Sequence, residues 1–79
     1  MYNMAHHQLD TQGLLCPMPV IKTQNKIKEL AIGDTLEVVA SDPGVMHDIP
    51  AWCRINGHTI VESSKEDRLC TILIEVCDS

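Results

Sequence analysis

A cysteine stands in a short proline-rich motif, Cys16-Pro17-Met18-Pro19, at the start of a segment with helical periodicity. Proline suits the first position of a helix, because its missing N–H would have no partner there. Cys16 is therefore expected at or beside the N-cap, where unpaired N–H groups and the helix dipole favour a thiolate. Such surroundings can lower a cysteine pKa from about 8.5 to about 3.5–7.5. Cys16 is thus predicted to be a nucleophilic thiolate; the alternative is a cysteine that packs at a helix entrance.

The sequence offers Cys16 no clear partner for hydrolytic or metal chemistry. A hydrolase nucleophile needs a histidine base and an orienting group, but His6, His7, His47 and His58 are scattered along the chain. A metal site from His6, His7 and Cys16 has no supporting pattern, so no metal is predicted. A lone thiolate exchanges directly with disulfides and persulfides, without an activated water. We therefore expect a transient persulfide on Cys16, passed on to another protein's cysteine, and no resident cofactor.

The other three cysteines, Cys53, Cys70 and Cys77, form no CxxC pair. Cys70 lies on the apolar face of a predicted strand and Cys53 at the margin of a helical apolar arc, so both are expected to pack in the core. Cys77 is expected to be a partly exposed thiol without a role. Cys53 is also a candidate secondary thiol, because a Cys16–Cys53 disulfide switch needs only Cα atoms within about 7 Å.

Length and composition limit the functions that this chain can perform. Its 79 residues are 44% hydrophobic and 22% charged, which predicts one folded domain over residues 1–79 with its core at about 7–77. Six Lys and Arg residues, a net charge of −5 and two aromatic residues exclude a basic, base-stacking surface for nucleic acid. No apolar run approaches the roughly 18 residues of a membrane span, and no signal peptide is evident. We expect a cytoplasmic monomer that binds neither nucleic acid nor membrane directly.

Six short elements are predicted to position Cys16. They are a strand over 7–11, a helix from Pro17 to the stop at Gly33, a strand over 35–40, a helix that begins at 41–44 and ends at 56–57, and strands over 59–63 and 69–77 joined by residues 64–68. Pro50 falls inside the second helix and predicts a kink or two short segments, the second capped by Asp48. Strands alternating with helices, then a hairpin, predict an α/β (α+β) two-layer sandwich whose mixed sheet carries both helices on one face.

Several spaced motifs together resemble the TusA/SirA-like sulfur-carrier family. They are Leu9-Asp10-x-x-Gly13-Leu14-x-Cys16-Pro17-x-Pro19, Gly33-Asp34-x-Leu36, Asp42-Pro43, Asp48-Ile49-Pro50-x-x-Cys53 and Gly57-His58. The match covers about residues 8–77, and the CPxP box after LDxxGLxCP is its specific part. Members of this family have the strand-helix-strand-helix-strand-strand sandwich, which agrees with the order predicted from the residues.

The resemblance implies that Cys16 is the active-site cysteine of a sulfurtransferase. Asp10, Gly13, Pro17 and Pro19 match scaffold positions of the motif. Family members accept sulfane sulfur as a persulfide from a cysteine desulfurase or rhodanese and pass it to DsrE-like relay proteins. The sulfur then enters tRNA wobble-uridine thiolation, sulfur oxidation or cofactor assembly.

Lys22 and Lys26 lie on the polar side of the first predicted helix and are candidates for contact with an acidic partner near Cys16. A simple solvated helix face is the alternative. Two other functions stay open at this point: a non-catalytic regulatory or interaction module on the same fold, and the thiol–disulfide switch that pairs Cys16 with Cys53.

Overall fold

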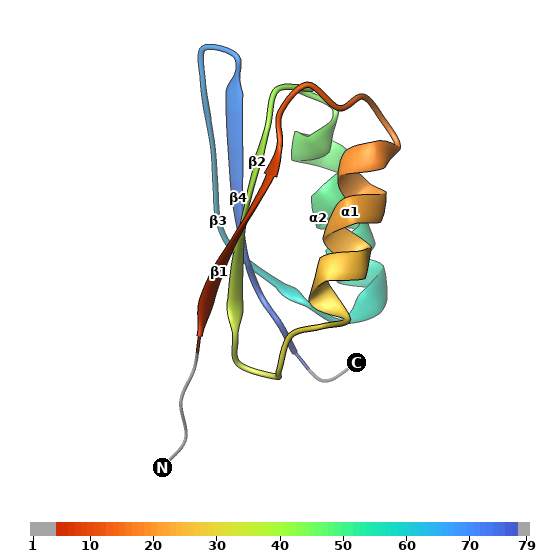
Figure 1. The fold of residues 1–79 in the computed structure, drawn as a ribbon, viewed down its shortest axis with the longest axis vertical. Helices are drawn as coiled ribbons and strands as arrows, with labels where there is room; N and C mark the ends of the chain where they lie inside the picture. Colours follow the sequence, from red (N-terminus) through yellow and green to blue (C-terminus); the bar gives the residue numbers. More distant parts are fainter. Residues whose placement is uncertain (1–4, 78–79) are drawn as a thin grey trace.

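Residues 5–77, which are the residues that the computed structural model describes, form a four-stranded sheet and two helices (Figure 1). In chain order the elements are β1 (His6–Thr11), α1 (Met18–Ile27), β2 (Thr35–Ala40), α2 (Val45–Asn56), β3 (Thr59–Glu66) and β4 (Leu69–Glu75). This is the predicted order. None of these helices is long and apolar enough to cross a membrane.

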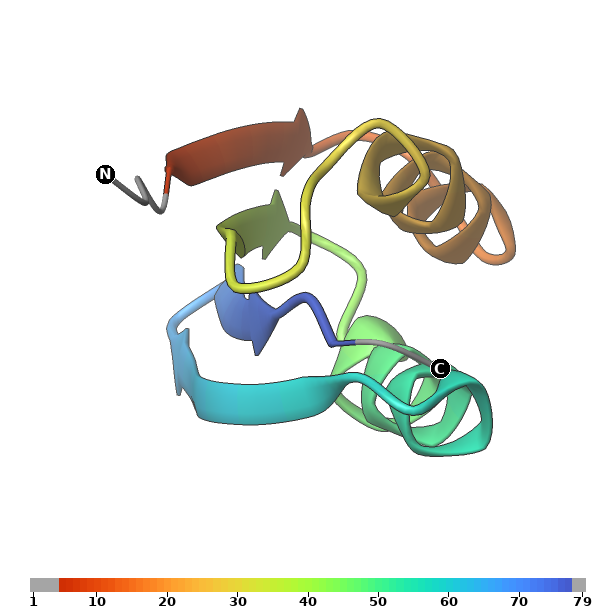
Figure 2. The same cartoon turned by 90° about the horizontal axis from the view of Figure 1, so that it is seen from below.

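The sheet has the spatial order β1-β2-β4-β3, with β1 parallel to β2 and the other neighbouring pairs antiparallel. Both helices lie on one face of it, α1 over β1 and β2 and α2 over β3 and β4, and they leave the other face uncovered (Figure 2). The predicted two-layer sandwich with a mixed sheet is therefore confirmed. Because β1 and β2 are parallel and Thr11 is level with Ala40, the loops that follow these two strands leave the sheet at the same edge.

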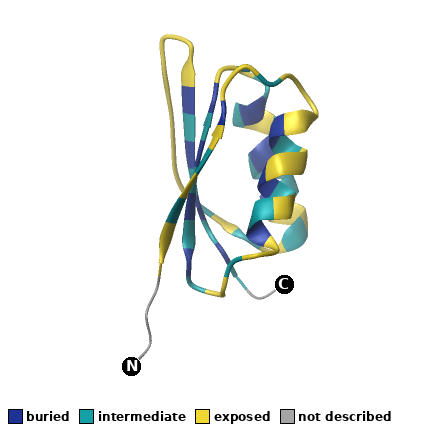
Figure 3. Cartoon of the chain, viewed as in Figure 1, coloured by how far each residue is buried: buried dark blue, intermediate teal, exposed yellow. Residues whose placement is uncertain are grey.

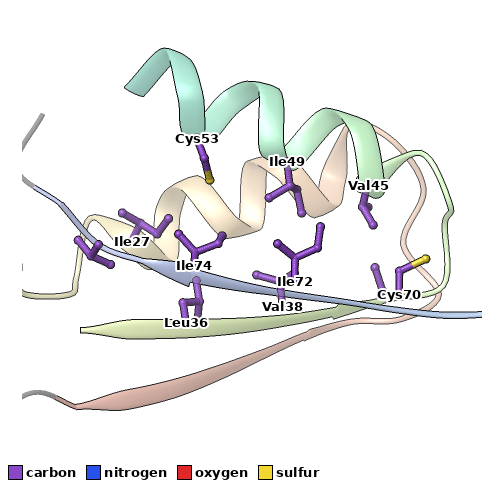
Figure 4. Close-up of a cluster of buried hydrophobic side chains, with 11 residues drawn as sticks. Ile27, Leu36, Val38, Val45, Ile49, Cys53, Cys70, Ile72 and Ile74 are labelled. Atoms are coloured by element: carbon purple, nitrogen blue, oxygen red, sulfur yellow. The ribbon is translucent and has the colours of Figure 1, made fainter. Parts of the chain in front are cut away.

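The core lies between the helices and the sheet, and strict alternation along the central strands builds it (Figure 3). From the sheet it takes Leu36, Val38, Ala40, Cys70, Ile72 and Ile74; from α2 it takes Val45, Ile49 and Cys53 (Figure 4). The strand residues recur every second position and the helix residues every fourth, so each set faces one way. The predicted packing of Cys53 and Cys70 is confirmed, since both are almost completely buried.

The first helix is shorter than predicted at both ends. Pro17 is the N-cap and Met18 the first helical residue, and the helix ends at Ile27 instead of continuing to Gly33. Beyond Ile27 the backbone closes tight turns, in which the N–H of Leu30 donates to the carbonyl of Ile27. Gly33, in the left-handed region at φ 94°, then donates to the carbonyl of Val76. This bond holds the chain next to the end of β4, where β2 begins two residues later. The residues after Ile27 therefore form turns instead of continuing the helix.

The second helix is continuous, so the prediction of two short segments with Asp48 as the second cap is wrong. Gly44 is its N-cap and Val45 its first residue, so the helix begins just after the predicted start at 41–44. Asp42 closes the turn before the helix: its side chain accepts the N–H of Gly44 and its carbonyl accepts the N–H of Val45. An interior proline costs about 3 kcal/mol or more. Ile49 and Cys53, on either side of Pro50, are completely buried against the sheet, and a large apolar side chain contributes about 1.5–3 kcal/mol on burial. Packing of this face therefore offsets much of the cost of Pro50.

The last two strands form a tighter hairpin than predicted. The strand β3 continues to Glu66, β4 ends at Glu75 rather than Cys77, and only Asp67 and Arg68 connect the two strands. Asp67 has a φ of 56°, which lets the chain reverse in so short a turn. The residues 63–66 of β3 pair with β4 and are all exposed, and the tip of the hairpin extends past the helices (Figure 3). Hydrophobic patterning cannot detect a strand that buries neither face.

Candidate active site at the Cys16 loop

Cys16 lies in the loop between β1 and α1, and the neighbouring loop between β2 and α2 holds this backbone in place. The N–H of Gly13 donates to Ser41 Oγ at 2.8 Å, and the N–H of Cys16 donates to Asp42 Oδ2 at 3.0 Å. Gly13 has a φ of 83°, a left-handed conformation that favours glycine. Each of the two bonds crosses more than 25 residues of sequence. The position of Cys16 therefore depends on the parallel pairing of β1 with β2.

The predicted scaffold residues surround this loop. Asp10 Oδ1 accepts the N–H of Gln12 at 2.9 Å and so fixes the turn that leads away from β1. Pro19 is completely buried under the first turn of α1, and the peptide bond between Cys16 and Pro17 is cis. These residues shape the backbone on both sides of Cys16.

The thiol of Cys16 is exposed to solvent and points at a carboxylate. Its Sγ donates a hydrogen bond to Asp48 Oδ2 at 3.4 Å. Asp48 lies in the first turn of α2, and Asp42, which accepts the Cys16 N–H, lies in the loop before that helix. Two carboxylates therefore stand beside the sulfur. Neither aspartate was predicted to contact Cys16, although both belong to the motifs that resemble the family, Asp42-Pro43 and Asp48-Ile49-Pro50.

These carboxylates reverse the predicted electrostatics of the site. The hydrogen bond to Asp48 raises the pKa of the Cys16 thiol, and the negative charges of Asp48 and Asp42 act in the same direction. The prediction that the start of the helix lowers this pKa is wrong. Pro17 and Pro19 have no N–H, and the N–H of Met18 between them donates to the carbonyl of Leu15 at 2.9 Å. The first turn of α1 thus gives the sulfur few donors, while α2 gives it an acceptor.

Three apolar residues of the Cys16 loop and of α1 have exposed side chains. Leu15 is 74% exposed, and Met18 and Ile21 are each about two-fifths exposed. They follow one another at three-residue intervals from the Cys16 loop into α1. Lys22 is exposed on the same helix, whereas Lys26 is half-buried and lies 3.9 Å from Glu29 Oε1. Contact of either lysine with a partner stays a prediction.

The other cysteines are less accessible than Cys16. The thiol of Cys53 is completely buried and points into the core (Figure 4), and burial raises its pKa to about 11. As a secondary thiol it therefore needs local opening of the fold before it can react. Cys77 is half-buried, with its sulfur 3.4 Å from Thr59 Oγ1. All four cysteines are free, so the structure contains no Cys16–Cys53 disulfide.

Three of the histidines are engaged away from the Cys16 loop. His6 bonds to Thr35, His7 to Asp34, and His58 stacks on Trp52 with its Nδ1 accepting the N–H of Cys77. Within residues 5–77, no three His, Cys, Asp or Glu side chains gather in a way that could hold a metal ion. The chemistry of this site rests on one exposed thiol and two carboxylates.

The structure is thus a small two-layer α/β domain with one exposed thiol on a loop that hydrogen bonds hold in place. The family model described as "Sulfurtransferase TusA" matches residues 7–76, and the chain belongs to this family, which supports a general role as a sulfur carrier. Among solved structures, the chain is similar to a SirA-like protein from Desulfitobacterium hafniense, with a TM-score of 0.79 and 20% sequence identity. That similarity covers 91% of this chain and 99% of the other, and it shows that the two proteins share a fold.

Proposed function

We propose that the protein accepts sulfane sulfur as a persulfide on Cys16 in the cytoplasm and relays it to a cysteine of an acceptor protein. The observation that carries this proposal is the exposure of Cys16. Among the described cysteines it alone has an exposed side chain, and two hydrogen bonds to the β2–α2 loop brace its backbone segment. A thiol presented in this way can meet a reactive sulfur on another protein.

The transfer needs no water activation and no change in net oxidation state. The Cys16 sulfur attacks the terminal sulfur of a donor persulfide, and a new S–S bond forms at Cys16. The donor's own S–S bond breaks, and its electron pair stays on the donor cysteine as a thiolate. The proton lost by Cys16 is balanced by protonation of that leaving thiolate. The same exchange in the opposite sense delivers the sulfur to the acceptor.

Partners follow from this chemistry and from the family. A cysteine desulfurase or rhodanese is the proposed donor, and a DsrE-like relay protein is the proposed acceptor. The end use is tRNA thiolation, sulfur oxidation or cofactor assembly. The exposed apolar side chains of Leu15, Met18 and Ile21, which are close to Cys16 in sequence, support docking of a protein partner, because exposed apolar residues that gather on a surface often mark such contacts.

Intact-protein mass spectrometry tests the proposal. The reduced protein is incubated with polysulfide, or with a cysteine desulfurase and cysteine, beside the variants Cys16→Ser and Cys77→Ser. We expect the native protein and Cys77→Ser to gain one sulfur atom that dithiothreitol removes, and Cys16→Ser to gain none. Equal loading of Cys16→Ser would show that the carrier thiol is a different one.

A regulatory or interaction module on the same fold is the second candidate function. The observation in its favour is the raised pKa of Cys16, since Asp48 and Asp42 disfavour the thiolate. Failure of every sulfur donor to load the native protein, with its fold intact by circular dichroism, would support this candidate over the carrier.

A further inference from the structure

Asp42 and Asp48 form no ion pair with Lys or Arg in the part of the chain that the structure describes. Both oxygens of Asp42 accept backbone N–H groups, those of Gly44 and Cys16, and Asp48 accepts the thiol of Cys16. The two negative charges come from α2 and from the loop before it, and both raise the pKa of the thiol. Two carboxylates without a cationic side chain, next to a group that must become an anion, oppose the first step of sulfur transfer.

The geometry also shows how the carboxylates hold the cysteine. Asp42 Oδ2 accepts the backbone N–H of Cys16 at 3.0 Å, and Asp48 Oδ2 accepts the hydrogen bond of its Sγ at 3.4 Å. The first bond fixes the backbone, and the second fixes the direction in which the sulfur points. Because a carboxylate is an acceptor only, the second bond requires the proton to be on the sulfur.

We propose that Asp42 and Asp48 are positioning residues that keep Cys16 an oriented, protonated thiol, and that a Lys or Arg side chain of the sulfur donor neutralises them so that the thiolate forms on docking. The inference rests on the proposed function. At rest the thiol reacts more slowly with alkylating agents and oxidants, because the thiolate is the reactive form. When the donor's cation reaches the carboxylates, the proton leaves for solvent. Cys16 then takes the terminal sulfur, while the donor cysteine departs as a thiolate and is protonated.

The first test is the pH profile of Cys16 alkylation by iodoacetamide, followed on its peptide by mass spectrometry. Asp48→Asn removes the charge and keeps the shape of the side chain, and Asp42→Asn is the second variant. Glu62→Gln, an exposed residue of β3, is the matched control because it changes the net charge by the same amount. We expect the midpoint to move to lower pH in both aspartate variants, to return toward the native value in Asp48→Glu, and to stay unchanged in Glu62→Gln.

The size of the rate change follows from thiol chemistry. Each unit by which the midpoint falls raises the thiolate fraction at pH 7 about tenfold. The intrinsic nucleophilicity falls at the same time, with a Brønsted slope of about 0.4–0.5, so the net gain is about threefold per unit. A midpoint that does not move in either Asp48→Asn or Asp42→Asn would overturn the inference.

The second test distinguishes two effects on the rate at which Cys16 accepts sulfur: the effect of a cation on the donor protein and the effect of the thiol's own pKa. Polysulfide is a small anion without Lys or Arg, whereas a cysteine desulfurase is a protein donor. We expect Asp48→Asn to load faster than the native protein from polysulfide but no faster from the desulfurase, because the variant already lacks the Asp48 charge that the donor's cation would neutralise. An equal gain with both donors would refute the role of a partner cation. If the native protein accepts sulfur from neither donor, the proposed function fails, whatever the alkylation profiles show.

Discussion

A buried hydroxyl in α1 makes the sharpest prediction about the stability of this fold. Thr23 is completely buried, and its Oγ1 has no hydrogen-bond partner among residues 5–77. An unsatisfied buried polar group costs about 1–3 kcal/mol. Valine replaces the hydroxyl by a methyl group of similar size, and its helix propensity is close to that of threonine. Thr23→Val is therefore expected to raise the free energy of unfolding by about 1–2 kcal/mol.

The measurement is urea unfolding followed by circular dichroism, with thermal melting beside it. For a domain of this size, 1 kcal/mol corresponds to about 4–8 °C in Tm, so the expected rise is roughly 5–15 °C. This is a large fraction of a total stability of about 4–12 kcal/mol, at 0.05–0.15 kcal/mol per residue.

Thr11 provides a matched control for the same substitution. It is also completely buried, but its Oγ1 donates to the carbonyl of Val39 at 2.8 Å. Thr11→Val removes a satisfied hydrogen bond and is expected to lower the free energy of unfolding by about 1 kcal/mol. The two substitutions should thus have opposite signs. If Thr23→Val destabilises the protein as Thr11→Val does, the hydroxyl of Thr23 has a partner in solution and the reasoning is wrong.

Two further predictions concern titrating groups away from the loop. Asp34 accepts the N–H groups of Ala5 and Ala31, and these hydrogen bonds hold its pKa below the usual value. Its contribution to stability is therefore present above pH ~4, the pKa of an unfolded aspartate, and is lost as the pH falls through the lower pKa of the folded state. Asp34→Asn should therefore lower the urea midpoint at pH 7, with a gap to the native protein that narrows on acidification; a gap independent of pH would contradict this. Burial raises the pKa of Cys53 to about 11, so iodoacetamide at pH 7.5 should label Cys16 in the native protein and Cys53 only in denaturant. Labelling of Cys53 at the same rate with and without denaturant would show that the core opens readily.

The helices and strands that could be predicted are those in which buried apolar residues recur at a regular spacing in the sequence. Cys70, Ile72 and Ile74 alternate along β4, and Val45, Ile49 and Cys53 recur along α2, so their elements and their inward faces could be assigned. The end of β3 could not be assigned in this way, because residues 63–66 bury neither face. The prediction of a break at Pro50 was wrong because it considered only the free-energy cost of a proline inside a helix. Packing of the neighbouring residues against the sheet outweighs that cost, and α2 is continuous.

Only the local part of the candidate site could be predicted from the sequence. The position of Cys16 just before a helix follows from the adjacent residues. Its contacts with Asp42 and Asp48 span 26 and 32 residues, and they exist because parallel pairing sets Thr11 level with Ala40 at one edge of the sheet. The only signal in the sequence was that both aspartates belong to the motifs shared with the family.

The residues adjacent to Cys16 in the sequence and the residues that contact it across the fold lead to opposite predictions for the protonation state of its sulfur. The start of a helix favours a thiolate through its unpaired N–H groups, but Pro17 and Pro19 carry no N–H, so these donors are missing from the first turn of α1. Asp48 and Asp42, which are distant from Cys16 in sequence, favour the thiol through their charges and through the hydrogen bond to Asp48. At this site the chain itself opposes the thiolate, and Leu15, Met18 and Ile21 of the Cys16 loop and α1 are exposed. Under the proposed relay, the reactivity of Cys16 therefore depends on the cation that a docked donor brings.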